Sequence, residues 1–181
     1  MKRLYFLIIL LSSLSLSAQK TATKKGPILT EFGSVFQIKN PELILQKDKV
    51  YKVIFDIYTN PAKEDNKPNP LLTTVARYLN MHAQHGVPAI NMKVIVIMHG
   101  KATKNALDTT TYFKKFKIEN PNQKLMQALK DVNVDLYVCG QSYLAKGFEL
   151  KNKSDIIKLS LSALTALVEF QSQGYQLITF N

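Results

Sequence analysis

The chain has 181 residues, of which 24 are basic and 13 acidic, giving a formal charge of +11, and 46% of its residues are hydrophobic. That length suits one compact domain, and the apolar content suffices for a folded core. A single cysteine excludes an internal disulfide and any zinc or iron–sulfur site built from several cysteines of one chain. The sequence predicts no metal site and no resident cofactor.

The first 18 residues have the three parts of a secretory signal peptide. Met1 to Arg3 is basic, Leu4 to Leu11 is apolar, and small residues with leucines run to Ala18, with cleavage expected after Ser17 or Ala18. A membrane anchor is the alternative, but a span needs about 20 apolar residues. We therefore expect export to a periplasm or to the cell exterior, with no membrane span after cleavage.

The next segments alternate between loops and strands. Residues 19–27 are polar and basic and predict a flexible leader before a single domain over residues 28–181. Gly33 to Ile38 is a short extended candidate, and Lys52 to Tyr58 predicts the first strong strand because it is rich in β-branched and aromatic residues. Three prolines between Pro61 and Pro70 indicate a loop.

Apolar residues at helical spacing follow this loop and predict a helix that ends near Gly86: Leu72, Val75, Ala76, Leu79 and Ala83. Lys93 to Met98 is a continuous apolar run, typical of a strand covered on both faces. Residues 101–117 are expected to hold a short helix and a loop.

The last third continues the alternation. Asn120 and Pro121 predict an N-cap and first helical residue, and Val134 to Val138 predicts a strand. Ser154 is expected to cap a long, well buried helix with an apolar stripe at Ile157, Leu161, Leu164 and Val168. Gly174 would end that helix before a terminal strand at residues 175–180. Alternating strands and helices predict an α/β layer fold with a mainly parallel sheet.

Ligands of open parallel sheets bind beyond the carboxyl ends of the strands. Three segments are predicted to meet at that edge: residues 58–60 ending in Asn60, His99 with Gly100, and Cys139 with Gly140, Gln141 and Ser142. Backbone N–H groups at the start of a following helix would favour the thiolate of Cys139. The cysteine is therefore a candidate nucleophile or sulfur carrier, with Asn60, Gly140, Gln141 and Ser142 as candidate binding residues.

Each of these residues also has a structural interpretation. A lone cysteine at the end of an apolar strand is commonly an inert core residue. His99 is either a base beside Cys139 or a polar residue at the end of its strand. His82 and His85 lie three residues apart but have no third metal ligand in the sequence, which favours a solvated helix face. Asp56 is expected to be a carboxylate with a structural partner.

The charge pattern argues against nucleic acid as a partner. Arg77 is the only arginine after residue 18, so the positive charge is almost entirely lysine, a hydrated point charge that lacks the planar fork of arginine. Lysines gather near residues 101–104, 114–117 and 146–153. A solvated surface is the simplest interpretation, although these segments could attract small anions. The sequence also lacks a dinucleotide fingerprint, a P-loop and a G-x-S-x-G elbow, which disfavours nicotinamide enzymes, NTPases and standard esterases.

Three segments together resemble the DsrE/DsrF-like family of sulfur-relay and related proteins. They are YKVIFDIY from Tyr51, KVIVIMHG from Lys93, and above all VDLYVCGQSYLAKGF from Val134 to Phe148. The resemblance covers Tyr51 to Asn181, and GPILTEFGSVFQIKNP before it is similar to the lead-in of exported members.

The resemblance implies a flavodoxin-like or DsrE-like three-layer α/β/α domain with about five mainly parallel strands, assembled as a trimer or hexamer. It also implies that Cys139 accepts and passes on persulfide sulfur, with sulfur donor and acceptor proteins as partners. The best understood members act in the cytoplasm within multi-subunit relays, whereas this chain carries an export signal. Whether the protein is an enzyme stays open, and a non-catalytic oligomeric scaffold with an inert cysteine is the alternative.

Overall fold

A computed structural model describes residues 22–61 and 66–180 of the chain. The predicted signal peptide, residues 1–18, lies outside them. Five parallel strands form one sheet in the order β4-β3-β2-β1-β5, with bounds β1 Tyr51–Ile57, β2 Met92–Met98, β3 Asp135–Cys139, β4 Lys158–Ser160 and β5 Gln176–Ile178. No helix within the described ranges has the length and hydrophobicity to cross a bilayer.

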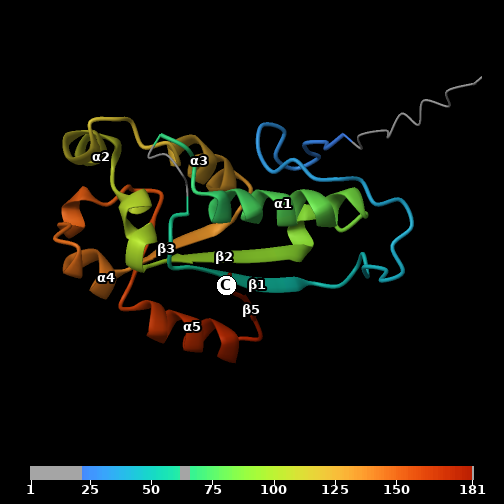
Figure 1. The fold of residues 1–181 in the computed structure, drawn as a ribbon. Helices are drawn as coiled ribbons and strands as arrows, with labels where there is room; N and C mark the ends of the chain where they lie inside the picture. The colour runs from blue at the N-terminus through green and yellow to red at the C-terminus, as the bar shows by residue number, and fades with distance from the viewer. Residues whose placement is uncertain (1–21, 62–65, 181) are drawn as a thin grey trace, which may run out of the picture.

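Helices cover both faces of this sheet. Their bounds are α1 Pro70–Gln84, α2 Thr109–Phe116, α3 Gln123–Asp131, α4 Gly140–Ala145 and α5 Ala163–Ser172. Helices α1 and α3 lie over one face and α5 lies over the other, so the predicted three-layer α/β/α architecture is confirmed (Figure 1). The region from Gly100 to Ala106 forms a 3-10 segment that leads to α2, in agreement with the short helix expected there.

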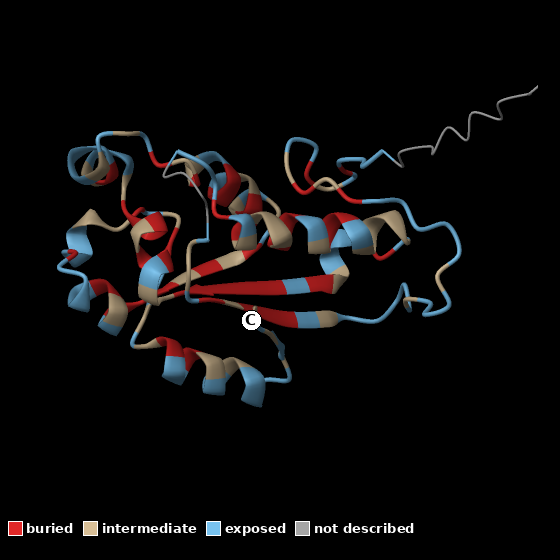
Figure 2. Ribbon diagram, viewed as in Figure 1, coloured by how far each residue is buried: buried red, intermediate tan, exposed pale blue. Residues whose placement is uncertain are grey.

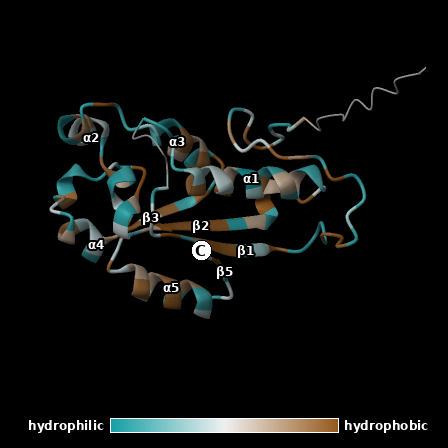
Figure 3. Cartoon of the chain, viewed as in Figure 1, coloured by the Kyte–Doolittle hydropathy of each residue, from teal (hydrophilic) through white to brown (hydrophobic). Residues whose placement is uncertain are grey.

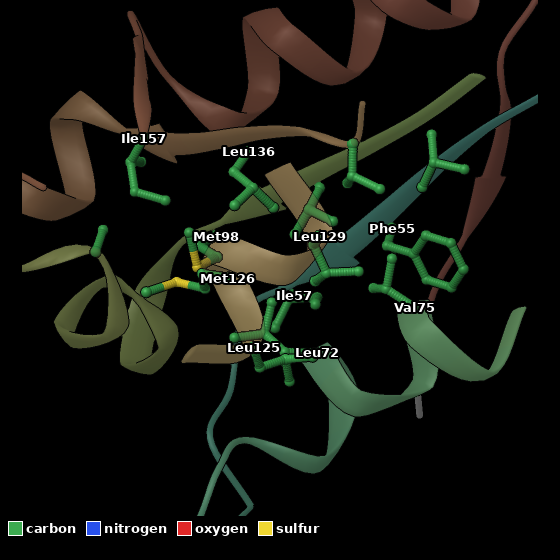
Figure 4. Close-up of a cluster of buried hydrophobic side chains, with 14 of the residues drawn as sticks. Phe55, Ile57, Leu72, Val75, Met98, Leu125, Met126, Leu129, Leu136 and Ile157 are labelled. Atoms are coloured by element: carbon green, nitrogen blue, oxygen red, sulfur yellow. The ribbon is translucent and has the colours of Figure 1, made fainter. Parts of the chain in front are cut away.

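The face under α1 and α3 carries the larger hydrophobic core. Leu72 and Val75 of α1 and Leu129 of α3 pack with Phe55 and Ile57 of β1 in a fully buried cluster (Figure 4). Burying one such side chain contributes about 1.5–3 kcal/mol. This face therefore supplies most of the hydrophobic stabilisation.

The face under α5 carries a much smaller cluster. Its buried members are Ile54, Ile95, Ile97, Cys139, Ala163 and Ala166. On α5 only Ala163 and Ala166 are buried, Leu167 and Phe170 are half-buried, and Leu164 and Val168 remain 79% and 70% exposed. The outer side of α5 is consequently exposed and apolar (Figures 2 and 3).

The prediction of a long, well buried helix capped by Ser154 was wrong. Residues 158–160 form β4, and the helix begins only after Ser162, whose side chain and that of Thr165 form a capping box. Ser154 is instead buried, with its N–H bonded to the Ala106 carbonyl. The local capping hydrogen bonds of Ser162 set the start of the helix, and the stripe at Leu161, Leu164 and Val168 therefore faces outward.

The predicted N-cap at Asn120 was also wrong, because α3 begins at Gln123 with Asn122 at its N-cap position. The Asn120 side chain accepts from the Asn122 N–H at 3.0 Å and donates to the Asn105 carbonyl at 2.9 Å. Asparagine side chains form such local turns as readily as they form caps.

The segment before β1 is attached to α1. Fully buried Asn80 accepts from the Leu29 N–H at 2.9 Å and donates to the carbonyls of Leu29, Phe32 and Gly33. Gly33 has a φ of +68°, and a Cβ on it would lie 2.5 Å from the backbone of Ala76. Lys24, in the predicted flexible leader, pairs with Val35. Part of that leader is thus already held against the domain.

Candidate functional site around Cys139

Cys139 lies where β3 ends and α4 begins, as predicted. It is the N-cap residue of α4, and its Sγ accepts from the Ser142 N–H at 3.3 Å. The residue is 3% exposed, and within residues 22–61 and 66–180 it is the one free cysteine. The thiol therefore sits at the carboxyl edge of the sheet, under the start of a helix.

Gly140 brings a second helix start to the same sulfur. A Cβ on Gly140 would lie 2.9 Å from the Ser160 carbonyl oxygen and 3.3 Å from that of Leu161. Only glycine therefore permits this close approach of the loop between β4 and α5. The approach places the Ala163 N–H, at the first turn of α5, within reach of Cys139.

These donors change the acidity of the thiol. Burial by itself raises the pKa of Cys139, but hydrogen bonds from the Ser142 side chain and from the N–H groups of Ser142, Ala163 and Gln141 outweigh it. The pKa of Cys139 is therefore lowered. Hydrogen bonds to the charged form and helix N-termini both favour a thiolate.

His99 and Asp56 form a hydrogen-bonded pair on the face of the sheet that carries Cys139. His99 Nε2 lies 2.8 Å from Asp56 Oδ1, with both side chains partly exposed. Strand β2 pairs Met98 with Val138 of β3, so the next residues on the two strands are His99 and Cys139. Alternation along β2 places His99 on the face of Ile95 and Ile97, which also pack in the Cys139 cluster. A thiol, an imidazole and a carboxylate thus end three neighbouring strands.

Backbone hydrogen bonds join the ends of β1 and β2 beside His99. The His99 N–H bonds to the Ile57 carbonyl at 3.0 Å, and the Lys101 N–H bonds to the Tyr58 carbonyl at 2.9 Å. Gly100 has a φ of +54°, and a Cβ there would lie 2.7 Å from the Tyr58 oxygen. Glycine is needed at this turn, and it fixes the backbone from which His99 projects.

The other predicted site residues divide into two groups. Ser142 and Gln141 donate to the sulfur, with the Gln141 side chain itself exposed. Asn60 is not among those donors; its side chain donates to Asn105 and lines a separate lysine-rich cavity. The sequence suggested a structural partner for Asp56 but did not identify it as His99.

The two other histidines bind backbone carbonyls of their own helix. His82 Nδ1 lies 2.9 Å from the Tyr78 oxygen, and His85 Nδ1 lies 2.9 Å from that of Met81. Burial lowers the pKa of His82. In the part of the chain that the structure describes, no group of three His, Cys, Asp or Glu side chains is arranged to hold a metal ion.

Comparisons with known proteins agree with this architecture. A family model for the DsrE/DsrF-like family matches residues 52–180. The chain belongs to this family.

Two solved structures have a similar fold. Protein MTH1491 of Methanobacterium thermoautotrophicum, described as of unknown function, is 15% identical to this chain with a TM-score of 0.53. The match covers 72% of this chain and 99% of that protein. The ychN protein of E. coli is 14% identical with a TM-score of 0.53 over the same shares. No match is found among curated protein sequences.

Membership of the DsrE/DsrF-like family confirms the resemblance carried by the strands and by the segment around Cys139. The matched residues include β2 to β5, all of β1 except Tyr51, and the junction between β3 and α4. The two solved structures share the fold with this DsrE-like chain at low identity.

Proposed function

We propose that this DsrE-like protein is exported and carries sulfur on Cys139 as a persulfide. The observation that carries the proposal is the set of N–H donors around the sulfur: the Ser142 N–H lies 3.3 Å from Sγ, and Ala163 and Gln141 also donate. An activated thiolate is the form of cysteine that attacks a sulfur–sulfur bond.

The step we propose is a balanced sulfur transfer. The Cys139 thiolate attacks the outer sulfur of a donor persulfide, a new S–S bond forms on Sγ, and the S–S bond of the donor breaks. The electron pair leaves with the inner sulfur of the donor as its thiolate, and any proton on the transferred sulfur travels with it. No outside oxidant is needed, because the transferred sulfur keeps its oxidation state.

His99 and Asp56 suit a supporting role in this step. Because His99 Nε2 bonds to Asp56 at 2.8 Å, Nδ1 is the ring nitrogen left for a second partner. A carboxylate that orients an imidazole beside a thiol is the general arrangement for activating a cysteine nucleophile. We propose that this pair holds or accepts the thiol proton while the thiolate reacts.

A different observation favours the rival function, a non-catalytic oligomeric protein with an inert cysteine. Cys139 is 3% exposed, and the surface of α4, β4 and α5 around it displays large apolar side chains: Leu144, Leu159, Leu161, Leu164 and Val168. Such a patch is typical of a protein–protein interface. In this reading the fold serves assembly, and the thiol is a small core residue.

Intact-mass measurement after incubation with polysulfide separates the two functions. The sulfur-carrier proposal predicts an added mass of one or more sulfur atoms that a reductant removes. The Cys139→Ala variant should show no such adduct. No adduct on the wild-type protein, or one that survives in the variant, would contradict the proposal.

The rate of alkylation against pH provides the second test. A thiol that carries sulfur should react with a midpoint below the ordinary cysteine pKa of about 8.5. The Ser142→Ala variant should move that midpoint upward, because it removes one of the hydrogen bonds to the sulfur. An inert cysteine would react slowly at every pH and would not respond to this change.

A further inference from the structure

The fold brings three lysine-rich segments together around one cavity. Its lining includes Lys101 and Lys104 of the 3-10 segment after β2, Lys115 of α2 and Lys146 after α4. The cavity has a volume of about 510 Å³. We call it the lysine pocket. These lysines lie up to 45 residues apart in sequence, so their meeting is a product of the fold and not of a local charge run.

The lysine pocket is strongly positive. Lys101, Lys115 and Lys146 are exposed, and within the described residues none of them forms an ion pair with a carboxylate. The acidic group that interacts with Lys115 is Glu149, which is itself paired with Lys151 at 2.7 Å. Several ammonium groups held around a concave wall repel one another and attract anions.

Two aromatic rings give the pocket an apolar wall and hold two of the lysines. The Lys104 ammonium lies 5.4 Å from the centre of the Phe116 ring, and that of Lys115 lies 5.3 Å from the centre of the Phe148 ring. Both rings also line the cavity. Cation–π contacts of this kind restrict where the charged groups sit before a ligand arrives.

The lysine pocket is separate from the site of Cys139. Phe148 belongs to the large hydrophobic cluster under α1 and α3, and Phe116 packs against that cluster. Cys139 belongs to the small cluster under α5, and it does not line the lysine pocket. A ligand in the pocket would therefore lie beside the cluster under α1 and α3, whereas the thiol lies in the cluster under α5.

We propose that the lysine pocket binds a small organic phosphate that combines a multiply charged head with a flat, uncharged body, of the class of a nucleoside diphosphate. Lysine binds phosphate as a point charge, and several such charges suit a group that carries more than one negative charge. A cavity of about 510 Å³ falls within the range of small-molecule sites and exceeds what an inorganic anion fills. Phe116 and Phe148 line the cavity and give the uncharged body an apolar wall, with most of the Phe148 side chain itself buried in the core.

Titration calorimetry with three probes tests the ligand class: ADP, inorganic pyrophosphate and adenosine. We expect ADP to bind in a saturable manner and more tightly than pyrophosphate, with adenosine weakest. Raising the salt from about 0.1 M to about 1 M should weaken ADP binding strongly, because the Debye length falls from about 10 Å to about 3 Å. Absence of saturable ADP binding, or equal affinity for ADP and pyrophosphate, would overturn the proposal.

A pair of triple variants tests the location. Replacing Lys101, Lys115 and Lys146 by Gln should weaken ADP binding by at least about tenfold, since three charge contacts are lost. The matched control replaces Lys114, Lys117 and Lys124, which are also exposed and do not line the pocket, and it should bind within about twofold of the wild type. Equal weakening in both triple variants would mean nonspecific attraction and would overturn the proposal. Cys139→Ala should leave ADP binding unchanged, so this test is independent of the sulfur-carrier proposal.

Discussion

The two faces of the sheet differ in the side chains that their helices bury. Under α1 and α3, long aliphatic side chains such as Leu72, Leu125 and Leu129 are completely buried against the strands. Under α5, the helix presents Ala163 and Ala166 to the sheet and leaves Leu164 and Val168 exposed. The first face, here called the α1 face, is a conventional core. The second, here called the thin face, is a smaller cluster in which isoleucines of the sheet meet the two alanines and the half-buried Leu167 and Phe170 of α5.

The thin face is the one that contains Cys139, His99 and Asp56. The missing side chain of Gly140 lets the backbone of the β4–α5 loop approach closely, and that approach supplies the Ala163 N–H to the thiol. Donors from two helix starts can then compensate for the burial of the sulfur. One face therefore contributes most of the buried apolar side chains, and the other, with a smaller cluster, creates an electrostatic site.

A leucine deletion on each face gives the largest expected contrast. Leu72→Ala should lower the free energy of unfolding by about 2–5 kcal/mol, because it leaves a cavity in a fully buried cluster. Leu164 of α5 is 79% exposed, so Leu164→Ala should lower the free energy of unfolding by less than about 0.5 kcal/mol. Urea unfolding of both variants at low protein concentration provides the measurement. Similar losses for the two would contradict the assignment of the core to the α1 face.

Gly140→Ala is the next largest effect and acts on the thin face. The added Cβ would lie 2.9 Å from the Ser160 oxygen, so the loop before α5 must move. We expect a loss of about 1–3 kcal/mol in the free energy of unfolding and a rise in the pKa of Cys139, because the Ala163 donor moves away. Alkylation against pH measures the second effect. Gly147→Ala is the control for the thiol: its φ of +70° makes alanine costly there, but no atom lies within 4 Å of the new Cβ, so stability should fall without a change in the alkylation profile. An unchanged alkylation profile in Gly140→Ala would show that the loop does not tune the thiol.

Sequence periodicity predicted the α1 face well. Of the predicted stripe, Leu72, Val75, Ala76 and Leu79 are buried and Ala83 is half-buried. Strands β1 and β2 begin and end within one residue of the predicted bounds. Long apolar side chains at helical spacing predict burial correctly when the helix packs on a large core, and α1 packs on the larger of the two clusters. The Cys139–Gly140 junction was also predictable, because a glycine directly after an apolar run marks a tight turn.

The thin face was harder to predict for physical reasons. The buried residues of α5 are alanines, and Leu167 and Phe170 are only half-buried, so the larger exposed side chains of Leu164 and Val168 indicated the wrong orientation. Strand β4 has only three residues, too few for a strand pattern to be recognised. The bond between His99 and Asp56 joins residues 43 apart in sequence, and only the register of β1 with β2 brings them together. Contacts of this type depend on tertiary structure that a local pattern does not encode.

Removing the carboxylate beside His99 should have a smaller effect that is confined to reactivity. Asp56→Asn keeps a hydrogen-bonding group but loses the charge that orients the imidazole, and we expect alkylation of Cys139 near neutral pH to slow about tenfold. Asp135→Asn is the matched control, because Asp135 also pairs with a basic group, Lys158, at 2.8 Å on the same sheet. Alkylation kinetics with a small haloacetamide provide the measurement. Equal rates for wild type and both variants would leave His99 with a structural role only.

The smallest expected effect is a pH-dependent contribution of Cys139 to stability. Its pKa is lowered in the folded protein, because the N–H donors outweigh the effect of burial. Between that lowered pKa and the unfolded value of about 8.5, the folded protein holds a thiolate while the unfolded chain binds one more proton. The free energy of unfolding should therefore rise with pH across this window, and the contribution should be lost as pH falls through the folded pKa.

Cys139→Ser isolates this contribution, since serine does not titrate in the same range. The difference in free energy of unfolding between wild type and variant should grow with pH from the lowered pKa of folded Cys139 up to about pH 8.5 and then level off. Tyr78 and Tyr143, whose pKa values burial raises to about 12, titrate in both proteins and cancel from the difference. A difference that shrinks as pH rises would mean that burial outweighs the hydrogen bonds and raises the pKa of Cys139. The thin face would then be a place for an inert cysteine, and the contrast between the two faces would concern packing alone.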